Sequence, residues 1–370
     1  MTSEYQVVRY RPEHRAAVLE LVKELWGPDP LRNAACFEWK YEKNPYLSDV
    51  LIYLATYRGE PVAMRGFIGS RWEAGLPPRE ATVLCAEDLV TVPEHRNRGL
   101  FRLMTETAFT DLRTRFQGFA LSLTAGIIAQ LGSLTMGWKS IAPMEPLERL
   151  SPSYRRRKRW LERFGRMSWL RRLGQPSGAR FDRLDAKASR PRLPSGLRLE
   201  RVPDPDAMAS LVERLKHDGR IRHRRDARYF RWRFRNPLRE YRFLYAGSPL
   251  FGYLVLHRSL SVPGAFRPVQ ISDVEATSPE VHRTLVETAL EHGRFPAVEA
   301  WGAALPGEAR TLLIEKGFRP LDPDHSNRAS RRALVRPLHN LENEAEWTLL
   351  ERGVLESGNW DFRMLYSMLG

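Results

Sequence analysis

The chain has 370 residues, a formal net charge of +15 and a hydrophobic fraction of 42%. This length and composition indicate two globular domains or one large one. No apolar run reaches the roughly 20 residues that a bilayer-spanning helix needs, and the N-terminus lacks the apolar core of a secretory leader. Two cysteines exclude a disulfide scaffold and a cysteine-rich zinc site, so we expect a cytoplasmic protein.

The first part of the chain predicts a strand, a helix and then further strands. Residues 5–9 alternate weakly between apolar and polar, and the apolar spacing that follows predicts a helix ending at Gly27. Residues 50–57 and 62–70 predict two strands on either side of a turn, and residues 81–92 predict a longer third strand.

A basic turn follows this third strand. The apolar run ends at Val92, and apolar residues at helical spacing begin after Gly99. A helix N-terminus presents unpaired backbone N–H groups and the positive end of the helix dipole, and here Arg96, Arg98 and Arg102 flank it. The strand, turn and helix therefore predict an anion-binding site that suits a phosphate.

Residues 119–124 then predict a buried strand, and residues 127–134 predict a short helix that leads to Gly137 and Trp138. The complete order of elements resembles that of the GNAT acetyltransferase family. In that family a mixed α/β sheet splays apart between its central strands and admits the pantetheine arm of coenzyme A.

The basic turn is similar to the motif Gln/Arg-x-x-Gly-x-Gly/Ala, with which this family cradles the pyrophosphate of coenzyme A. The turn matches the motif at Arg96 and Gly99 and departs from it at Phe101, where the family has a small residue. The resemblance implies that acetyl-CoA is the acyl donor. It implies binding by Val90, Val92, Arg96, Asn97, Arg98, Gly99, Leu100, Phe101 and Arg102.

The resemblance also implies which groups carry the chemistry. The family places its base, often a carboxylate, on the strand before the turn, where this chain has Glu87 and Asp88. Adjacent strand residues face opposite sides, so one of them should face the cleft, and we favour Glu87; the alternative is a salt-bridged strand residue. Many relatives place a tyrosine acid five residues before the aromatic residue at Trp138, a position held here by Ser133, whose hydroxyl can hydrogen-bond the sulfur.

The segment after Trp138 holds most of the excess positive charge, between residues 151 and 197. Residues 154–173 predict an amphipathic helix in which Trp160 and Trp169 are interleaved with arginines. This helix either packs on the domains with its arginines in water or lies on an anionic membrane surface, and contact with nucleic acid is the least favoured reading.

The chain then repeats itself. Residues 197–201 resemble the first strand, and residues 230–234 (Phe-Arg-Trp-Arg-Phe) echo residues 37–41 (Phe-Glu-Trp-Lys-Tyr). The offset is about 193 residues, and the order of elements agrees with the aromatic spacing. The second copy has no glycine in residues 277–283, the counterpart of the turn at Gly99, so its backbone cannot easily wrap a pyrophosphate.

We therefore expect an α/β protein of two tandem GNAT-like mixed-sheet domains, with a degenerate C-terminal copy and a basic helical linker between them. The expected parts are an acyl-CoA-binding domain at 1–148, the linker at 149–196, the degenerate domain at 197–338 and a tail at 339–370. The tail is rich in aromatic residues, so it should pack on the body.

These features predict an acyl-CoA-dependent N-acyltransferase, which transfers acetyl from acetyl-CoA to a primary amine of a small molecule or amino sugar by direct attack. Two alternatives stay open: a Fem-like ligase that uses aminoacyl-tRNA, and a non-catalytic module that binds CoA or a partner. Cys85 fits a small buried residue better than an acyl carrier. The histidines lack metal-ligand spacing, so no metal site is expected. The sequence predicts neither the exact acceptor nor an oligomeric state.

Overall fold

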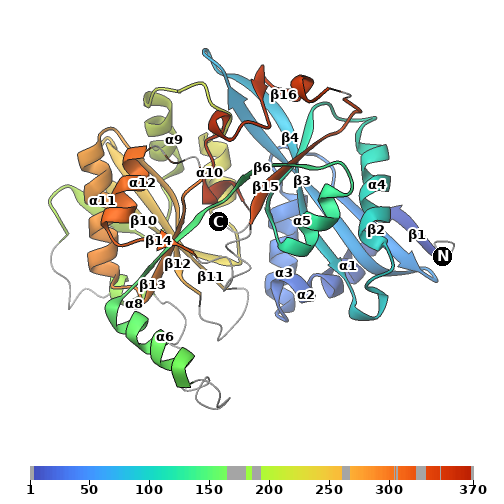
Figure 1. Ribbon diagram of the computed structural model, residues 1–370, viewed down its shortest axis with the longest axis horizontal. Helices are drawn as coiled ribbons and strands as arrows, with labels where there is room; N and C mark the ends of the chain where they lie inside the picture. Colours follow the sequence, from blue (N-terminus) through green and yellow to red (C-terminus); the bar gives the residue numbers. More distant parts are fainter. Residues whose placement is uncertain are drawn as a thin grey trace.

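The computed structural model describes residues 4–164, 181–185, 193–260, 267–303, 305, 307–321, 331–341 and 343–367. In these residues the chain forms two lobes, each a mixed β-sheet with helices packed on it (Figure 1). The first lobe is drawn in blue to cyan and the second mainly in yellow to orange. The expected fold class, two tandem mixed α/β sheets, is confirmed.

The first sheet is antiparallel except between β4 and β5, which run parallel. Its long strands β2 and β3 are buried along nearly their whole length, as expected for strands covered on both faces. The strands, in spatial order, are β1 (Tyr5–Arg9), β2 (Leu51–Tyr57), β3 (Glu60–Ala74), β4 (Arg79–Thr91), β5 (Phe119–Ala125), β15 (Arg332–Pro337) and β6 (Lys139–Pro143), with β9 (Arg222–His223) beside β3.

Helices cover both faces of this sheet. Met64 of β3 belongs to one core cluster with Val18, whereas Phe67 of β3 belongs to another with Phe109, because alternate strand residues point to opposite faces. The helix expected to end at Gly27 is broken in two at Val22. One face holds α1 (Arg15–Leu21), α2 (Lys23–Trp26), α3 (Pro30–Phe37) and the helical turn η2 (Glu38–Glu42), the other holds α4 (Leu100–Leu112), and α5 (Ile127–Leu134) follows β5.

The second sheet repeats this plan. Its antiparallel strands again give way to one parallel pair, between β12 and β13. In spatial order its strands are β14 (Arg319–Pro320), β7 (Pro146–Leu150), β13 (Ala297–Trp301), β12 (Val269–Ala276), β11 (Gly252–Ser259), β10 (Arg239–Ala246) and β8 (Leu197–Glu200). Its helices are α6 (Pro152–Phe164), α8 (Asp182–Asp185), α9 (Pro205–Arg214), α10 (Ala227–Arg233), α11 (Pro279–Gly293) and α12 (Gly307–Glu315).

The two lobes exchange strands. β7 leaves the first half of the chain and lies between β13 and β14 of the second sheet. β15 comes from the second half and lies between β5 and β6 of the first sheet. The domain boundaries expected near residues 148 and 338 stay a prediction. The first sheet contains β15 from the second half of the chain, and the second sheet contains β7 from the first half.

The internal repeat is visible as a pair of stacked indoles at the junction of the lobes. The Trp39 and Trp232 rings lie 5.2 Å apart with 16° between their planes. The Trp39 Nε1–H donates to the Trp232 carbonyl oxygen at 2.7 Å, and the Trp232 Nε1–H donates to the Trp39 carbonyl oxygen at 2.8 Å. Equivalent residues of the two copies therefore meet each other through the same contacts in both directions.

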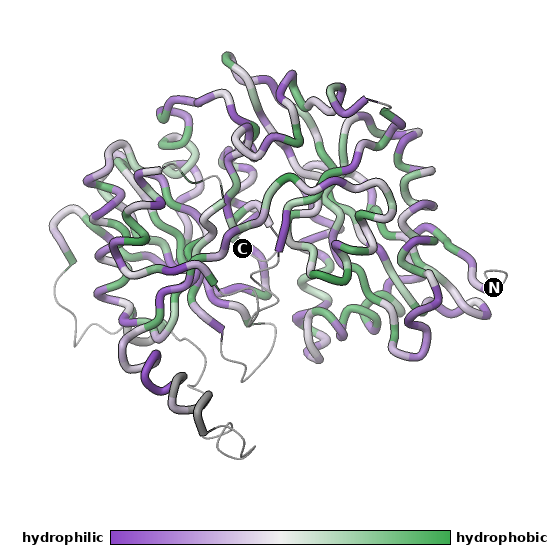
Figure 2. Tube along the Cα trace, in the orientation of Figure 1, coloured by the Kyte–Doolittle hydropathy of each residue, from purple (hydrophilic) through white to green (hydrophobic). Residues whose placement is uncertain are grey.

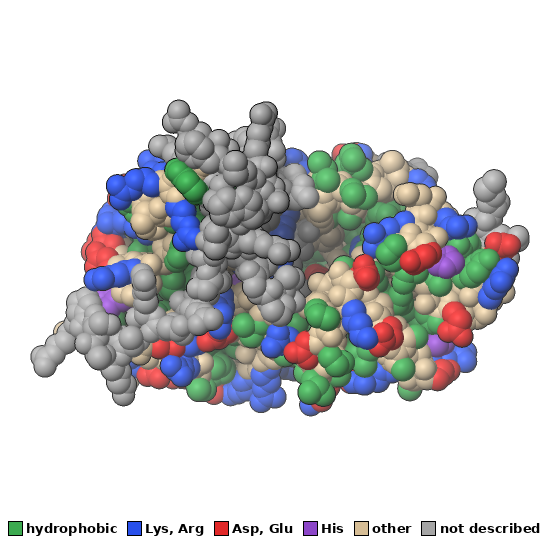
Figure 3. Space-filling model, turned by 90° about the horizontal axis from the view of Figure 1, so that it is seen from below, with side chains coloured by type: hydrophobic (Ala, Val, Ile, Leu, Met, Phe, Trp, Pro, Cys, Tyr) green, Lys and Arg blue, Asp and Glu red, His purple; other side chains and the backbone are tan. Residues whose placement is uncertain are grey.

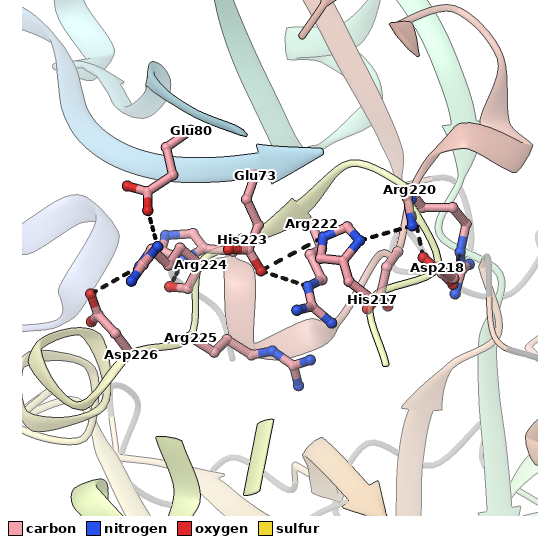
Figure 4. A network of polar contacts seen from close by, with 12 residues as sticks. Glu73, Glu80, His217, Asp218, Arg220, Arg222, His223, Arg224, Arg225 and Asp226 are labelled. Atoms are coloured by element: carbon pink, nitrogen blue, oxygen red, sulfur yellow. Dashed lines mark hydrogen bonds and ion pairs between the residues drawn. The ribbon is translucent and has the colours of Figure 1, made fainter. Parts of the chain in front are cut away.

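A polar network adds to this junction (Figure 4). Glu73 of β3 accepts from Arg222 at 2.7 Å and lies 3.7 Å from His217, while Glu80 of β4 is paired with Arg224. Because β9 also pairs with β3, a segment of the second half is tied to the first lobe by both backbone and side chains.

Hydropathy follows this architecture. Apolar residues gather along the strands of both sheets in Figure 2, and the face drawn in Figure 3 carries cations and anions over both lobes. No helix in the described part of the chain is long and apolar enough to cross a bilayer. The predicted amphipathic helix begins within α6, where Trp160 is half exposed, but its residues 165–173 lie outside the described residues.

Candidate active site

The first sheet is split between β4 and β5. Their parallel ladder consists of two residue pairs, Leu84 with Ala120 and Cys85 with Leu121. Beyond Cys85, β4 continues to Thr91 while staying paired with β3, so its other edge faces an opening. This is the splayed geometry that the family resemblance implied.

A cleft of about 420 Å³ occupies the split. The three residues predicted to be catalytic, Glu87, Asp88 and Ser133, all lie on its wall. The second lobe closes part of the cleft, so the site is built by both halves of the chain. The other lining residues are Leu25, Trp26, Cys36, Trp39, Lys40, Arg65, Ala86, Leu89, Ser122, Ala125, Gly126 and Ala129 from the first half and Asn236, Leu238, Arg239 and Arg331 from the second.

Both carboxylates face the cleft, although the alternation of strand residues predicts that only one of them does so. Across β3 and β4, Arg65 pairs with Leu89 and Gly66 pairs with Glu87, so Asp88 is an extra residue in a β-bulge. Its backbone adopts a φ of 29°, which is unusual for a residue other than glycine. The bulge interrupts the strict alternation on which the expectation rested, and it brings neighbouring carboxylates to one side.

Lys40 of η2 holds the two carboxylates together. Its Nζ lies 2.8 Å from Asp88 Oδ2 and 3.2 Å from Glu87 Oε2, and its side chain is almost fully buried. The Tyr41 hydroxyl donates to Asp88 at 2.6 Å, and the Trp26 Nε1–H donates to the other oxygen of Asp88 at 3.3 Å. Asp88 is thus fully occupied, while Glu87 is the carboxylate with fewer partners.

Burial sets the protonation behaviour of this cluster. Burial raises the pKa of Glu87, against the lowering effect of Lys40. Burial alone would lower the pKa of Lys40, but the charges of Asp88 and Glu87 raise it, so Lys40 stays cationic. A carboxylate with a raised pKa at the wall of a cleft is suited to accept a proton from a substrate.

The basic turn at the outer end of β4 has the conformation of an anion-binding loop. Gly99 caps α4 with a left-handed φ of 75°, no side chain caps the helix, and a β-carbon at Gly99 would meet nothing within 4 Å. Arg96, Arg98 and Arg102 are exposed around it. Arg98 is the most weakly held of the three, through one contact of 3.5 Å to the Glu94 carbonyl oxygen.

The departure from the family motif at Phe101 leaves the turn open. The Phe101 ring lies against Gly132 of α5, where a β-carbon would come within 2.7 Å of it, and beneath the Arg65 guanidinium at 5.7 Å. Arg102 also donates to the hydroxyl of Thr135, the residue that follows α5, at 3.0 Å. The N-terminus of α4 and the helix that carries Ser133 therefore lie next to each other.

The backbone N–H of Val92, one of the predicted binding residues, does not face the split. The Val92 N–H donates to the Val62 carbonyl oxygen at 3.0 Å, so it points to β3 and away from the split. Since N–H directions alternate along a strand, the N–H groups of Leu89 and Thr91 face the split instead. Neither Val90 nor Val92 is among the residues that line the cleft, and their roles in binding stay predictions.

Sequence reasoning missed two cations in the cleft, Lys40 and Arg65. Lys40 stands in the aromatic segment that recurs about 193 residues later as Arg233, and a cation kept in both copies was a usable signal. Arg65 lies within an apolar strand and gave no such signal. Burial raises the pKa of Cys85 to about 12, so this residue stays a neutral thiol. Within the residues described, no group of three or more His, Cys, Asp or Glu side chains is placed to hold a metal ion.

Comparison with known proteins supports the fold through structure alone. No protein-family model and no curated protein matches the sequence. A GCN5-related N-acetyltransferase from Anabaena variabilis superposes with a TM-score of 0.58 at 11% identity, over 90% of this chain and 73% of that one. One from Kribbella flavida does so with 0.52 at 14%, over 90% and 72%.

A tandem GNAT protein from the clavulanic acid biosynthesis pathway superposes with a TM-score of 0.54 at 14% identity, over 92% of this chain and 100% of that one. At such identities these likenesses establish the fold: the chain is built as a tandem of two GNAT folds.

Proposed function

We propose that this protein is an acyl-CoA-dependent N-acyltransferase that transfers acetyl from acetyl-CoA to a primary amine of a small molecule or amino sugar. The observation that carries the proposal is that β4 has an acidic cleft on one side and leads directly into an uncapped, arginine-flanked helix N-terminus. The cleft is lined by two largely buried carboxylates of β4, and the helix is α4. The helix N-terminus suits a diphosphate, and the carboxylates of the cleft suit an amine that must lose a proton.

In this proposal the diphosphate of CoA binds at the Gly99 turn, and the pantetheine arm lies in the split beside β4. The acceptor amine attacks the thioester carbon, and Glu87 takes a proton from the amine. The new C–N bond forms, the C–S bond breaks, and the sulfur leaves with the bonding electron pair. Asp88, fixed by Lys40 and Tyr41, holds the bulge in place.

The second lobe contributes to the acceptor side of the cleft through Asn236, Leu238 and Arg239. The acceptor therefore contacts a surface that a single GNAT fold does not provide. This arrangement also supports the choice of a small acceptor, because the cleft is bounded by both lobes.

The first experiment is binding of acetyl-CoA to the full-length protein. At a concentration one hundred times its Kd, the ligand should stabilise the fold by about 2.7 kcal/mol and raise the melting temperature. A thiol-release assay with a panel of amines and amino sugars then identifies the acceptor. An unchanged melting temperature at millimolar acetyl-CoA would overturn the proposal, and binding without turnover on any amine would favour the non-catalytic module.

The Fem-like alternative has its own signature. A ligase that uses aminoacyl-tRNA binds RNA through phosphate contacts, so its affinity falls steeply as salt increases. Salt-dependent binding of tRNA together with failure to bind acetyl-CoA would favour that reading over an N-acetyltransferase.

A further inference from the structure

Arg65 is a buried cation on the wall of the cleft, and it has no role in the acyl transfer proposed so far. Its side chain is 5% exposed, and it lies on β3 between Ala63 and Phe67, which both point to the α4 face. The guanidinium lies over the rings of Phe67 at 5.5 Å and Phe101 at 5.7 Å. Two aromatic rings therefore hold it in one place at the split.

This guanidinium has few partners for a buried charge. In the part of the chain that the structure describes, its one hydrogen-bond acceptor is the Glu87 carbonyl oxygen, 3.3 Å from Nη1, and its Nε is buried without an acceptor. A guanidinium has five N–H donors. Burial lowers the pKa of Arg65 to about 10, so the group is still charged at neutral pH.

The nearest carboxylates serve a different cation. Glu87 and Asp88 are both within ion-pair distance of Lys40, whose η2 lies on the face covered by α1 to α3. Arg65 lies on the opposite face, with α4 and the Gly99 turn. Glu87 and Asp88 act on Arg65 only at longer range, because among the described residues they form their ion pairs with Lys40. A buried guanidinium without an ion pair of its own is suited to an anion that arrives from the α4 side.

We propose that Arg65 is a catalytic residue that stabilises the negative charge on the CoA sulfur as the thioester breaks. This inference rests on the proposed function, in which the donor enters from the α4 side and its sulfur stops in the split. Ser133, at the position where the family has an acid, lines the same cleft, and an aliphatic hydroxyl is a poor proton donor.

The step balances without a proton from the protein. When the tetrahedral intermediate collapses, the C–S bond breaks and its electron pair goes to sulfur. Arg65 keeps its proton and donates N–H bonds to the thiolate, which takes up a proton from water after release. A consequence follows for the product complex: CoA should bind with its thiol ionised at a lower pH than in solution.

The test is a titration of the CoA thiol in its complex with the full-length protein, followed by the ultraviolet absorbance of the thiolate. In the unsubstituted protein the thiol pKa should fall by at least one unit, a tenfold change in the thiolate-to-thiol ratio. Arg65→Met should remove this shift and Arg65→Lys should keep part of it. A merely structural role would change stability or affinity but not the thiol pKa.

Arg336→Met is the matched control. Arg336 also lies over a ring of the α4 helix, Phe109 at 4.1 Å, but it is paired with Glu106 and does not line the cleft. This variant should bind CoA with the same thiol pKa as the unsubstituted protein. Melting temperatures of all the variants, measured with and without CoA, show whether each one is folded.

Three results would overturn the inference. One is CoA that binds with an unshifted thiol pKa, and another is a shift that survives Arg65→Met. The third is an Arg65→Met protein that loses affinity for succinyl-CoA but not for acetyl-CoA while the pKa of the CoA thiol stays shifted. Arg65 would then bind a carboxylate on the acyl group. If the unsubstituted protein fails to bind CoA, the proposed function falls together with this inference, whereas binding without a shift overturns the inference alone.

Discussion

The two lobes have the same split sheet, but one split is open and the other is filled. In the second sheet the parallel ladder between β12 and β13 again consists of two pairs, Val269 with Val298 and Gln270 with Glu299. The space next to it is about 40 Å³, against about 420 Å³ in the first lobe. Phe362, Arg363 and Met364, from the C-terminal end of the described chain, line what is left.

Polar groups near the two splits are used differently. Lys40 of the first lobe and Arg233 of the second hold the same place in the repeated aromatic segment, and Asp273 lies next to a bulge of β12 as Asp88 lies in the bulge of β4. Arg233 donates to the carbonyl oxygens of Leu365 at 2.9 Å and Ser367 at 2.8 Å, and Asp273 is paired with Arg363 at 2.7 Å. Polar groups beside the filled split therefore bind the chain's own tail, whereas those beside the open split face a cleft.

The helix N-termini differ in the same way. No side chain caps α4, which begins at the left-handed Gly99. α11 is capped by Ser278, whose hydroxyl accepts from the Val281 N–H at 3.4 Å. In the second lobe the chain itself thus satisfies groups that stay open in the first, and the architecture of the fold is kept.

The largest expected effect comes from removing the proposed base of the open cleft. Glu87→Gln should lower kcat by about 10² to 10⁴-fold, the usual contribution of general base catalysis. Because burial raises the pKa of Glu87 and the base must be ionised, activity should rise as the pH increases through that pKa. The variant should lose this limb of the pH profile, as measured by thiol release.

Glu275→Gln, which changes a largely buried carboxylate beside the filled split, is the control variant. Glu275 is paired with Arg225 at 2.5 Å and Arg363 at 2.8 Å, so its loss should lower stability and leave kcat unchanged. Activity that falls in this variant while the melting temperature holds would mean that the second lobe takes part in the chemistry. An unaltered pH profile in Glu87→Gln would assign the base elsewhere.

A smaller effect is expected at the helix N-termini. Arg98→Glu places a negative charge beside the proposed phosphate site and removes a cation, so the Kd for CoA should rise at least tenfold, about 1.4 kcal/mol. Calorimetric titration with CoA measures this change, and the melting temperature should stay close to that of the unsubstituted protein because Arg98 is exposed.

Arg283→Glu, on α11 of the second lobe, is the matched control. It breaks exposed contacts to Glu287 and Glu315, which are worth little, and it should leave CoA affinity unchanged. Equal losses of CoA affinity in Arg98→Glu and Arg283→Glu would show that this affinity depends on the net charge of the protein rather than on the turn at Gly99.

Much of this fold could be predicted from the order and spacing of residues. The aromatic segment at 37–41 and its echo at 230–234 revealed the repeat, and the basic turn before α4 located the candidate phosphate site. Strand exchange could not be predicted, because the apolar patterns of β7 and β15 suit either sheet. Pairing partners far apart in the chain leave no local signal.

The candidate site was predictable to the level of residue type. The carboxylates and Ser133 do line one cleft, but the bulge at Asp88 broke the rule of alternation by which one carboxylate was chosen. Lys40 could have been noticed only through its repeat as Arg233, and Arg65 only as a cation within an apolar strand. Their importance comes from burial beside the split, which depends on tertiary structure.

The smallest effect is expected at the junction of the two lobes, where Trp39 and Trp232 contact each other. Substituting each indole in turn tests whether the two copies contribute equally to this junction. Trp39→Phe and Trp232→Phe each remove one reciprocal Nε1–H donor and leave a buried carbonyl oxygen without it, so each should lower the free energy of unfolding by about 1 kcal/mol. Urea unfolding of both variants and of the double variant measures these losses. Because the indoles are stacked, the effects of the two substitutions on the free energy of unfolding should not be additive in the double variant.

A clear loss of stability in one of the two single variants and none in the other would mean that the junction is asymmetric. The first lobe, where Trp39 also lines the cleft, would then depend on this contact in a way that the second does not.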